Sequence, residues 1–241
     1  MLREALVGMA MFVGYYILAA SLIVVVKVCL KPPAEWVRKL LHSVCFLSVF
    51  VLLYAFKTWY LAVFAALAFA LIVYPVITLI EQYPKLMGIF QQRKSGEIKT
   101  SLMLVFLMMA ALITIFWGLL GEQWKYIIAV SIMAWGFGDA AAALVGKSLG
   151  RRQIRSRLVD GKKTVEGSFA MYAVSALAIL ATLLAYASAP WYLCLATALL
   201  VAPICALVEL VSHHGMDTVT VPFAAAVPVY TLMSLFTYMG V

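Results

Sequence analysis

The chain has 241 residues, of which 66% are hydrophobic and only 12% are charged, and its formal net charge is +8. A mean hydropathy of +1.05 exceeds that of soluble globular domains and predicts an integral membrane protein. A basic chain can bind nucleic acid, but the basic residues of a membrane protein mark its cytoplasmic loops. We therefore expect no nucleic-acid partner.

Several apolar stretches are long enough to cross a bilayer, which takes about 20 helical residues. In chain order, these stretches lie near residues 5–26, 40–56, 58–80, 101–121, 125–146, 168–189, 191–210 and 221–240. The first is too long for a removable signal peptide and is interpreted as a retained helix. No linker divides the chain, so we expect one all-α domain over residues 1–241, a bundle of about eight transmembrane helices. Residues 81–97 resemble a short interfacial amphipathic segment.

The basic residues predict how the bundle is oriented. Fifteen of the 18 lie in the loops after the first, third and fifth helices, and seven of them lie in the loop 147–163. The positive-inside rule places these loops in the cytoplasm and both termini on the opposite side. The membrane would be the inner membrane of a prokaryotic cell, or the endoplasmic reticulum or plastid membrane of a eukaryotic one.

Carboxylates on otherwise apolar helices are the most informative feature of the chain. Ionisable groups at membrane depth are costly and indicate a functional site. In the predicted topology Asp139, Glu166, Glu209 and Asp217 all lie on the cytoplasmic side. Asp139 either pairs with a nearby arginine or serves as a metal ligand or catalytic base, and the second interpretation is favoured. From residue 164 onward the chain contains no Lys or Arg, so cationic partners for the later acids must come from elsewhere.

The loop 147–163 and the start of the next helix form the most specific motif. Arg151, Lys162 and Lys163 carry charges that can grip phosphate oxygens. Thr164 is a predicted N-cap, and the helix after it would present free backbone N–H groups to an anion. Glu166 either favours the helix dipole or acts as a catalytic base.

Two other features of this region have simpler explanations. Gly146-Lys147-Ser148 resembles the end of a phosphate-binding P-loop, but the first glycine of that motif is missing. Arg155 and Arg157 are explained as topology signals alone. Neither feature is expected to take part in the chemistry.

The segment from Glu209 to Pro222 completes the set of polar motifs. Its adjacent histidines have no third zinc ligand in register, and carboxylates suit Mg²⁺ (or Mn²⁺) better. Asp139, Glu209 and Asp217 are therefore the predicted metal ligands. If one ion joins Asp139 to Glu209, the two carboxylates should lie within about 8 Å of each other. Pro222 is interpreted as a helix-start residue.

A shared metal ion would also require the fifth and seventh helices to pack together at their cytoplasmic ends. Gly136, Ala140 and Ala143 are small enough to permit that approach. A weaker motif near the first cytoplasmic loop, Arg38-Lys39-x-x-His42, supplies further candidates for phosphate binding. Interfacial side chains that reach toward water would give the same pattern.

Together these motifs resemble the family of dolichol kinases, phytol kinases and CTP-dependent diacylglycerol kinases. The matching segments are Arg38-Lys39-x-x-His42, Gly138-Asp139-Ala-x-Ala, Gly146-x-x-x-Gly150-Arg151, Gly161-Lys162-Lys163-Thr164-x-Glu166-Gly167-Ser168, and Glu209 with Asp217-x-x-Thr220-Val221-Pro222. The resemblance implies a multipass kinase that transfers the γ-phosphate of CTP to a lipid alcohol with the help of a divalent metal. Thr218 follows Asp217 where the family often has asparagine.

On this resemblance the expected substrate is an isoprenoid alcohol such as phytol, farnesol or a polyprenol, with diacylglycerol as the alternative. Lys163, Asp139 and Glu166 are the candidate catalytic residues, and which carboxylate is the base stays open. Arg38, Lys39, His42, Arg151, Lys162, Lys163 and Thr164 are the candidate nucleotide ligands. The expected partners are a nucleoside triphosphate, the lipid alcohol and the bilayer, with a homodimer left open.

Two other functions are weighed against the kinase. The motifs around Asp139 and Lys163 are also similar to those of phosphatidate cytidylyltransferases, but those enzymes carry closely paired aspartates where this chain has only Asp217. An ion-coupled transporter would place its acids near the middle of the membrane. The predicted acids lie near helix ends beside a basic loop, which favours an interfacial enzyme.

Overall fold

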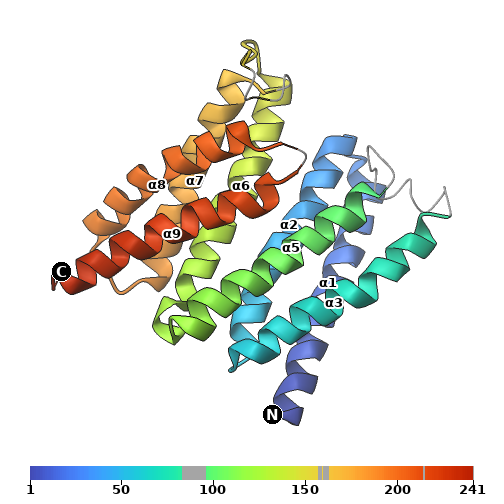
Figure 1. Ribbon diagram of the computed structural model, residues 1–241. Helices are drawn as coiled ribbons and strands as arrows, with labels where there is room; N and C mark the ends of the chain where they lie inside the picture. Colours follow the sequence, from blue (N-terminus) through green and yellow to red (C-terminus); the bar gives the residue numbers. More distant parts are fainter. Residues whose placement is uncertain (83–95, 157–158, 160–162, 214, 241) are drawn as a thin grey trace. The chain divides into compact units, whose positions relative to one another are not determined.

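The structure is a computed structural model, and it describes residues 1–82, 96–156, 159, 163–213 and 215–240. Within these ranges the chain forms helices and a single isolated β-bridge (Figure 1). Eight helices of the described chain are long and apolar enough to cross a membrane, as the sequence predicts. The all-α membrane bundle expected from the hydropathy pattern is therefore confirmed.

The residue contacts group the chain into two compact units, Met1–Leu120 and Gly121–Val241. Unit 1 contains α1 (Leu2–Leu30), α2 (Ala34–Tyr54), α3 (Trp59–Ile80), α5 (Glu97–Leu112) and the π-helix η1 (Ile113–Leu119). Unit 2 contains the short 3₁₀-helix η2 (Glu122–Trp124), α6 (Lys125–Ser148), α7 (Val165–Tyr186), α8 (Trp191–Val211) and α9 (Asp217–Tyr238). The single domain expected over residues 1–241 stays a prediction. The proposed interfacial segment 81–97 lies largely outside the described residues.

Unit 1 is held together by aromatic packing and by polar contacts at helix ends. Phe12, Phe69 and Phe106, from α1, α3 and α5, meet edge to face with ring centroids 5.1 to 6.1 Å apart. Glu4 of α1 accepts hydrogen bonds from the backbone N–H and the hydroxyl of Thr58, both at 3.1 Å. Its carboxylate therefore satisfies part of the N-terminal end of α3.

Unit 2 is built around the close contact of α6 and α7. Small residues of α6, including Gly138 and Gly146, face α7, and a Cβ atom at Gly138 would lie 2.6 Å from the sulfur of Met171. The hydroxyl of Ser175 in α7 donates to the carbonyl of Ala134 in α6 at 3.2 Å. Because the contact is this close, glycine is required at several positions along it.

The partner of α6 differs from the one expected. The sequence predicts that the helix containing Asp139 packs directly against the helix containing Glu209, through Gly136, Ala140 and Ala143. Instead α7 packs extensively against both α6 and α8, which touch each other only slightly (Figure 1). The small residues that allow close approach in α6 are Gly138 and Gly146, and they serve the contact with α7.

The starts of two helices matter for the site: that of α7 follows the predicted N-cap Thr164, whereas that of α9 comes before Pro222, the residue interpreted as a helix start. α7 begins at Val165, so Glu166 lies in its first turn. α9 begins at Asp217, so this acid is the first residue of the helix and Pro222 lies inside it. Hydropathy cannot detect these starts, because the first turns of both helices are polar.

The predicted orientation can be checked by labelling single cysteines in a variant without the four native ones. Cysteines at Ser156 and Ser212 should resist an impermeant thiol reagent in intact cells and react once the membrane is permeabilised, because both precede helices that start on the cytoplasmic side. A cysteine at Ser188, in the short connection between α7 and α8, is the control and should react from outside. Labelling of Ser156 and Ser212 from opposite sides would contradict the topology.

Candidate functional site

The candidate site lies at one end of unit 2, where α6 and α8 end and α7 and α9 begin (Figure 1). Because these four helices are antiparallel neighbours in the chain, their polar ends come together. Glu166 is in the first turn of α7, Glu209 is near the end of α8, and Asp217 starts α9. The grouping of these motifs at one end agrees with the sequence prediction.

The loop between α6 and α7 is closed at its base by an antiparallel β-bridge between Gln153 and Thr164. The N–H of Ile154 donates to the carbonyl of Lys163, and the N–H of Val165 donates to the carbonyl of Arg152, both at 3.0 Å. This bridge brings the arginines that follow α6 next to the start of α7.

Thr164 is the N-cap of α7, as predicted. Its backbone is extended, and its hydroxyl accepts a hydrogen bond from the N–H of Gly167 at 3.1 Å. Two of the N–H groups expected to face an anion already have partners, because Thr164 accepts from that of Gly167 and the Arg152 carbonyl accepts from that of Val165. At this end of α7, groups of the chain itself accept hydrogen bonds from the N–H groups of Val165 and Gly167.

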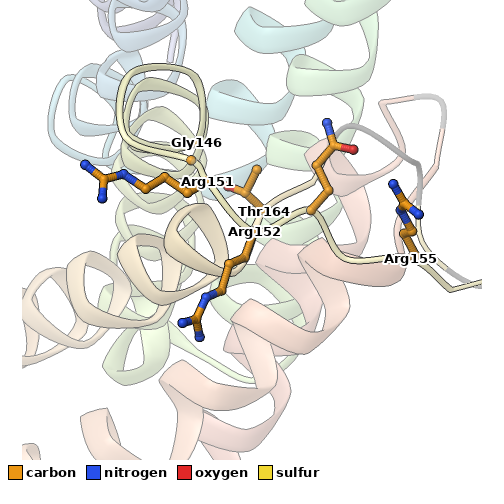
Figure 2. Close-up of a pocket in the computed structure, with 7 residues that line it drawn as sticks. Gly146, Arg151, Arg152, Arg155 and Thr164 are labelled. Carbon is orange, nitrogen blue, oxygen red and sulfur yellow. The ribbon is translucent and has the colours of Figure 1, made fainter.

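A polar hollow of about 530 Å³ opens beside this N-cap, and we call it the arginine hollow (Figure 2). It is lined by Gly146, Gly150, Arg151, Arg152, Gln153, Arg155 and Thr164. Figure 2 shows the guanidinium groups of Arg151, Arg152 and Arg155 pointing in different directions around the hollow, so they surround it without converging on one point.

The arginine hollow is lined by two predicted phosphate ligands and by one arginine that the sequence predicted only as a topology signal, and the roles of all three stay predictions. Arg151 and Thr164 line it, as expected for phosphate-binding residues. Arg155, which the sequence analysis assigned to topology alone, also lines it, together with Arg152 and Gln153. Sequence reasoning missed these three because their placement depends on the β-bridge across the loop.

The glycines of this region allow backbone to approach backbone. A Cβ atom at Gly167 would lie 3.0 Å from the carbonyl oxygen of Ala142 and 3.3 Å from the Cα of Gly146. A Cβ atom at Gly150 would lie 2.8 Å from the side chain of Thr164. These glycines therefore serve packing at the floor of the hollow.

Glu166 makes a structural contact at the edge of the loop. One of its carboxylate oxygens accepts a hydrogen bond from the backbone N–H of Arg152 at 3.3 Å. The contact ties the first turn of α7 to the turn that carries the arginines. Its proposed role as catalytic base stays a prediction, and this geometry supports a structural role instead.

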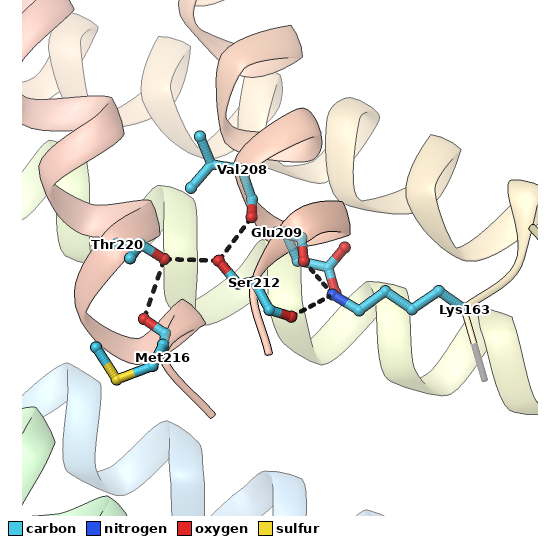
Figure 3. A network of polar contacts seen from close by, with 6 residues as sticks. All are labelled: Lys163, Val208, Glu209, Ser212, Met216 and Thr220. Atoms are coloured by element: carbon cyan, nitrogen blue, oxygen red, sulfur yellow. Dashed lines mark hydrogen bonds and ion pairs between the residues drawn. The ribbon is translucent and has the colours of Figure 1, made fainter. Parts of the chain in front are cut away.

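Lys163 is not among the residues that line the arginine hollow, where a phosphate ligand is expected. Its ammonium lies against the C-terminal end of α8, where its Nζ forms an ion pair with Glu209 Oε1 at 2.8 Å (Figure 3). The same nitrogen donates to the backbone carbonyls of Glu209 and Ser212. The cationic partner that the sequence requires for Glu209 is therefore Lys163.

The predicted metal ligands are not gathered into one group. In the part of the chain that the structure describes, no three His, Cys, Asp or Glu side chains are placed to hold a metal ion together. Glu209 is only 8% exposed and is engaged by Lys163, while Asp139 lies half-buried within α6. Carboxylates suit Mg²⁺ chemically, but Asp139, Glu209 and Asp217 do not fit it as a preformed set.

The remaining predicted ligands are found elsewhere. Lys162 lies outside the described residues. Arg38, Lys39 and His42 belong to α2 in unit 1, where Arg38 pairs with Glu35 at 2.5 Å and Lys39 is 7% exposed. The ring of His42 meets that of Phe46 edge to face, with centroids 5.7 Å apart. Their role in nucleotide binding stays a prediction.

Comparison of the chain with models of protein families, with characterised proteins and with solved structures gave no match.

Proposed function

We propose that this chain is a membrane-embedded kinase that transfers the γ-phosphate of a nucleoside triphosphate, CTP, to the hydroxyl of an isoprenoid lipid alcohol. The observation that carries the proposal is the arginine hollow. Three arginines surround a polar space beside the N-cap of α7, at the end of a unit built of membrane-spanning helices. The positive charge of the arginine hollow suits a phosphorylated substrate. Its position at the end of membrane-spanning helices suits a lipid acceptor.

The arginine hollow has the chemistry to hold a polyphosphate chain. Guanidinium groups bind phosphate oxygens through paired, charge-assisted hydrogen bonds. Gly146, Gly150 and the buried Thr164 line the hollow beside these arginines. The arginines are exposed, so closing them around a ligand would require side-chain rotation rather than movement of helices.

Asp139 is the best candidate for the base that accepts the proton of the alcohol. It precedes Gly146 by seven residues, which places the two on nearly the same face of α6, about 10 Å apart along the axis. Asp139 thus lies about two helical turns deeper in the membrane than the hollow. An alcohol whose hydroxyl reaches this depth from the lipid side would lie between the carboxylate and the phosphates.

The remaining residues of the site would act by charge and position. Phosphoryl transfer needs alignment and neutralisation of charge more than covalent catalysis. Arg151, Arg152 and Arg155 would neutralise the donor phosphates, and Glu166 would hold the Arg152 backbone in place. A divalent ion, when bound with the nucleotide, would supply further neutralisation.

The test is an assay of the purified protein in detergent with CTP labelled at either the γ- or the α-phosphorus. Phytol, farnesol, a long polyprenol and diacylglycerol would be offered separately as acceptors. Label entering the lipid phase from the γ position alone supports the kinase and identifies the acceptor. Label from the α position would show cytidylyl transfer instead, and no label from either position with any acceptor would overturn the proposal.

The arginines of the hollow should affect the nucleotide rather than the lipid. Arg152→Gln and Arg155→Gln are each expected to raise the KM for CTP about tenfold, because each removes a charge-assisted hydrogen bond to phosphate. The KM for the lipid alcohol should change little. Lys57→Gln, which removes an exposed charge in unit 1, is the control and should leave both constants unchanged. An effect of Arg155→Gln confined to the lipid KM would contradict the assignment.

A further inference from the structure

The ammonium of Lys163 has all of its hydrogen-bonding capacity in use. Its three oxygen contacts are Glu209 Oε1 at 2.8 Å, the backbone carbonyl of Glu209, and the backbone carbonyl of Ser212 at 3.5 Å (Figure 3). A lysine ammonium has three donors and no acceptor, so these contacts account for all of them. The side chains of Lys163 and Glu209 are only 20% and 11% exposed.

These contacts satisfy the C-terminal end of α8. The last carbonyls of a helix have no partner within it and carry partial negative charge, which a cation stabilises. The last turn of α8 has no basic residue, and no Lys or Arg follows residue 163 in the chain. Lys163 therefore supplies from another element the charge that a helix usually carries in its own last turn.

The backbone of Lys163 is fixed at the wall of the arginine hollow. Its carbonyl accepts the N–H of Ile154 at 3.0 Å, and the next residue is the N-cap Thr164. On the far side of the contact, Ser212 continues the network: its hydroxyl lies 2.7 Å from that of Thr220 in α9 and donates to the carbonyl of Val208 at 2.6 Å (Figure 3). One lysine thus connects the hollow, the end of α8 and the start of α9.

We infer that Lys163 is a positioning residue: together with Glu209 and Ser212 it forms a clasp that ties the end of α8, and through Ser212 the start of α9, to the base of the loop that carries the arginines. In this role Lys163 does not contact the nucleotide, and Glu209 is its counter-ion rather than a metal ligand. This role belongs to the same site as the proposed function, and only its kinetic predictions rest on that function.

Thermal unfolding in detergent tests the clasp without reference to activity. Lys163→Met leaves the carboxylate of Glu209 buried without its partner. The midpoint of thermal unfolding should therefore fall by about 5–10 °C. Glu209→Gln added to Lys163→Met removes that buried charge, so the double variant should be more stable than Lys163→Met alone. Lys163→Arg keeps a charged donor and should recover at least about half of the loss. A double variant less stable than both single variants would overturn the inference.

Kinetics provide a second and independent readout. Lys163→Met should lower kcat at least about tenfold with the KM for CTP changed less than about threefold, whereas Arg155→Gln should raise that KM. Glu209→Gln should leave unchanged the Mg²⁺ concentration that gives half-maximal activity. A large rise in the KM for CTP with an unchanged unfolding midpoint would show that Lys163 is a phosphate ligand. If no kinase activity exists, the thermal results still decide whether the clasp is present.

Discussion

Replacing Asp139 by asparagine is expected to lower phosphoryl transfer by about 10²–10⁴-fold while the protein still inserts and folds. The substitution keeps the size of the side chain and removes only its charge and its ability to accept a proton. Because Asp139 is half-buried in α6, the change should not disturb packing, and the unfolding midpoint should stay close to that of the parent protein. The loss should appear in kcat.

The expected effect follows from where Asp139 lies. The eleven residues of α6 that are buried include the run from Ile127 to Gly136, which is apolar except for Ser131. Asp139 follows this run and precedes Gly146, a residue of the arginine hollow, by two helical turns. A carboxylate at this depth of a membrane-spanning helix is costly to keep, which indicates a functional role.

The measurement is initial-rate kinetics with CTP and the acceptor found in the labelling assay, at matched amounts of folded protein. Glu122→Gln is the control for charge removal, because Glu122 is 74% exposed and its nearest cation, Lys125, is 4.0 Å away. It should retain activity within about twofold of the parent. Activity of Asp139→Asn within about threefold of the parent would remove Asp139 from the catalytic site.

The sequence predicted the features of the fold that are determined by residues close together in the chain. The hydropathy of each helix, the N-cap at Thr164 and the grouping of polar helix ends all follow from residues close together in the chain. The end of α1 also depends on local residues, although the predicted stretch ended near residue 26: Lys31 adopts a left-handed conformation with φ 44°, and two prolines follow it and stop the helix.

The placement of several site residues depends on contacts between distant segments. Lys163 and Glu209 are 46 positions apart, and no local pattern shows that the ammonium turns toward α8 rather than toward the hollow. Arg155 looked like a topology signal because its position relative to Thr164 is set by the β-bridge. α7 likewise packs against both α6 and α8, a helix arrangement that the residues of any single helix do not reveal.

Replacing Gly167 by leucine is expected to destabilise the protein by forcing apart the close contact of α6 and α7. A Cβ atom there would meet the backbone of α6 at Ala142 and Gly146, at 3.0 and 3.3 Å, and the Thr164 hydroxyl at 3.1 Å. Backbone cannot rotate away as a side chain can, so three further carbons would force α7 apart from α6. Overpacking of this kind typically costs about 1–3 kcal/mol and occasionally more.

The loss should appear both in stability and at the hollow. The unfolding midpoint should fall by about 5–10 °C, and binding of CTP should weaken because Gly146 and Thr164 line the hollow and also contact Gly167. Gly167→Ala should show a smaller fall, since its single methyl group needs a shift of only a few tenths of an ångström.

Gly14→Leu is the matched control, because it introduces the same side chain on the exposed surface of α1, where nothing lies within 4 Å of an added Cβ. It should be neutral or slightly stabilising, since leucine favours a helix more than glycine does. If Gly167→Leu were as stable as Gly14→Leu, the close contact of α6 and α7 would be absent. The arginine hollow, whose floor that contact forms, would then have to be placed elsewhere.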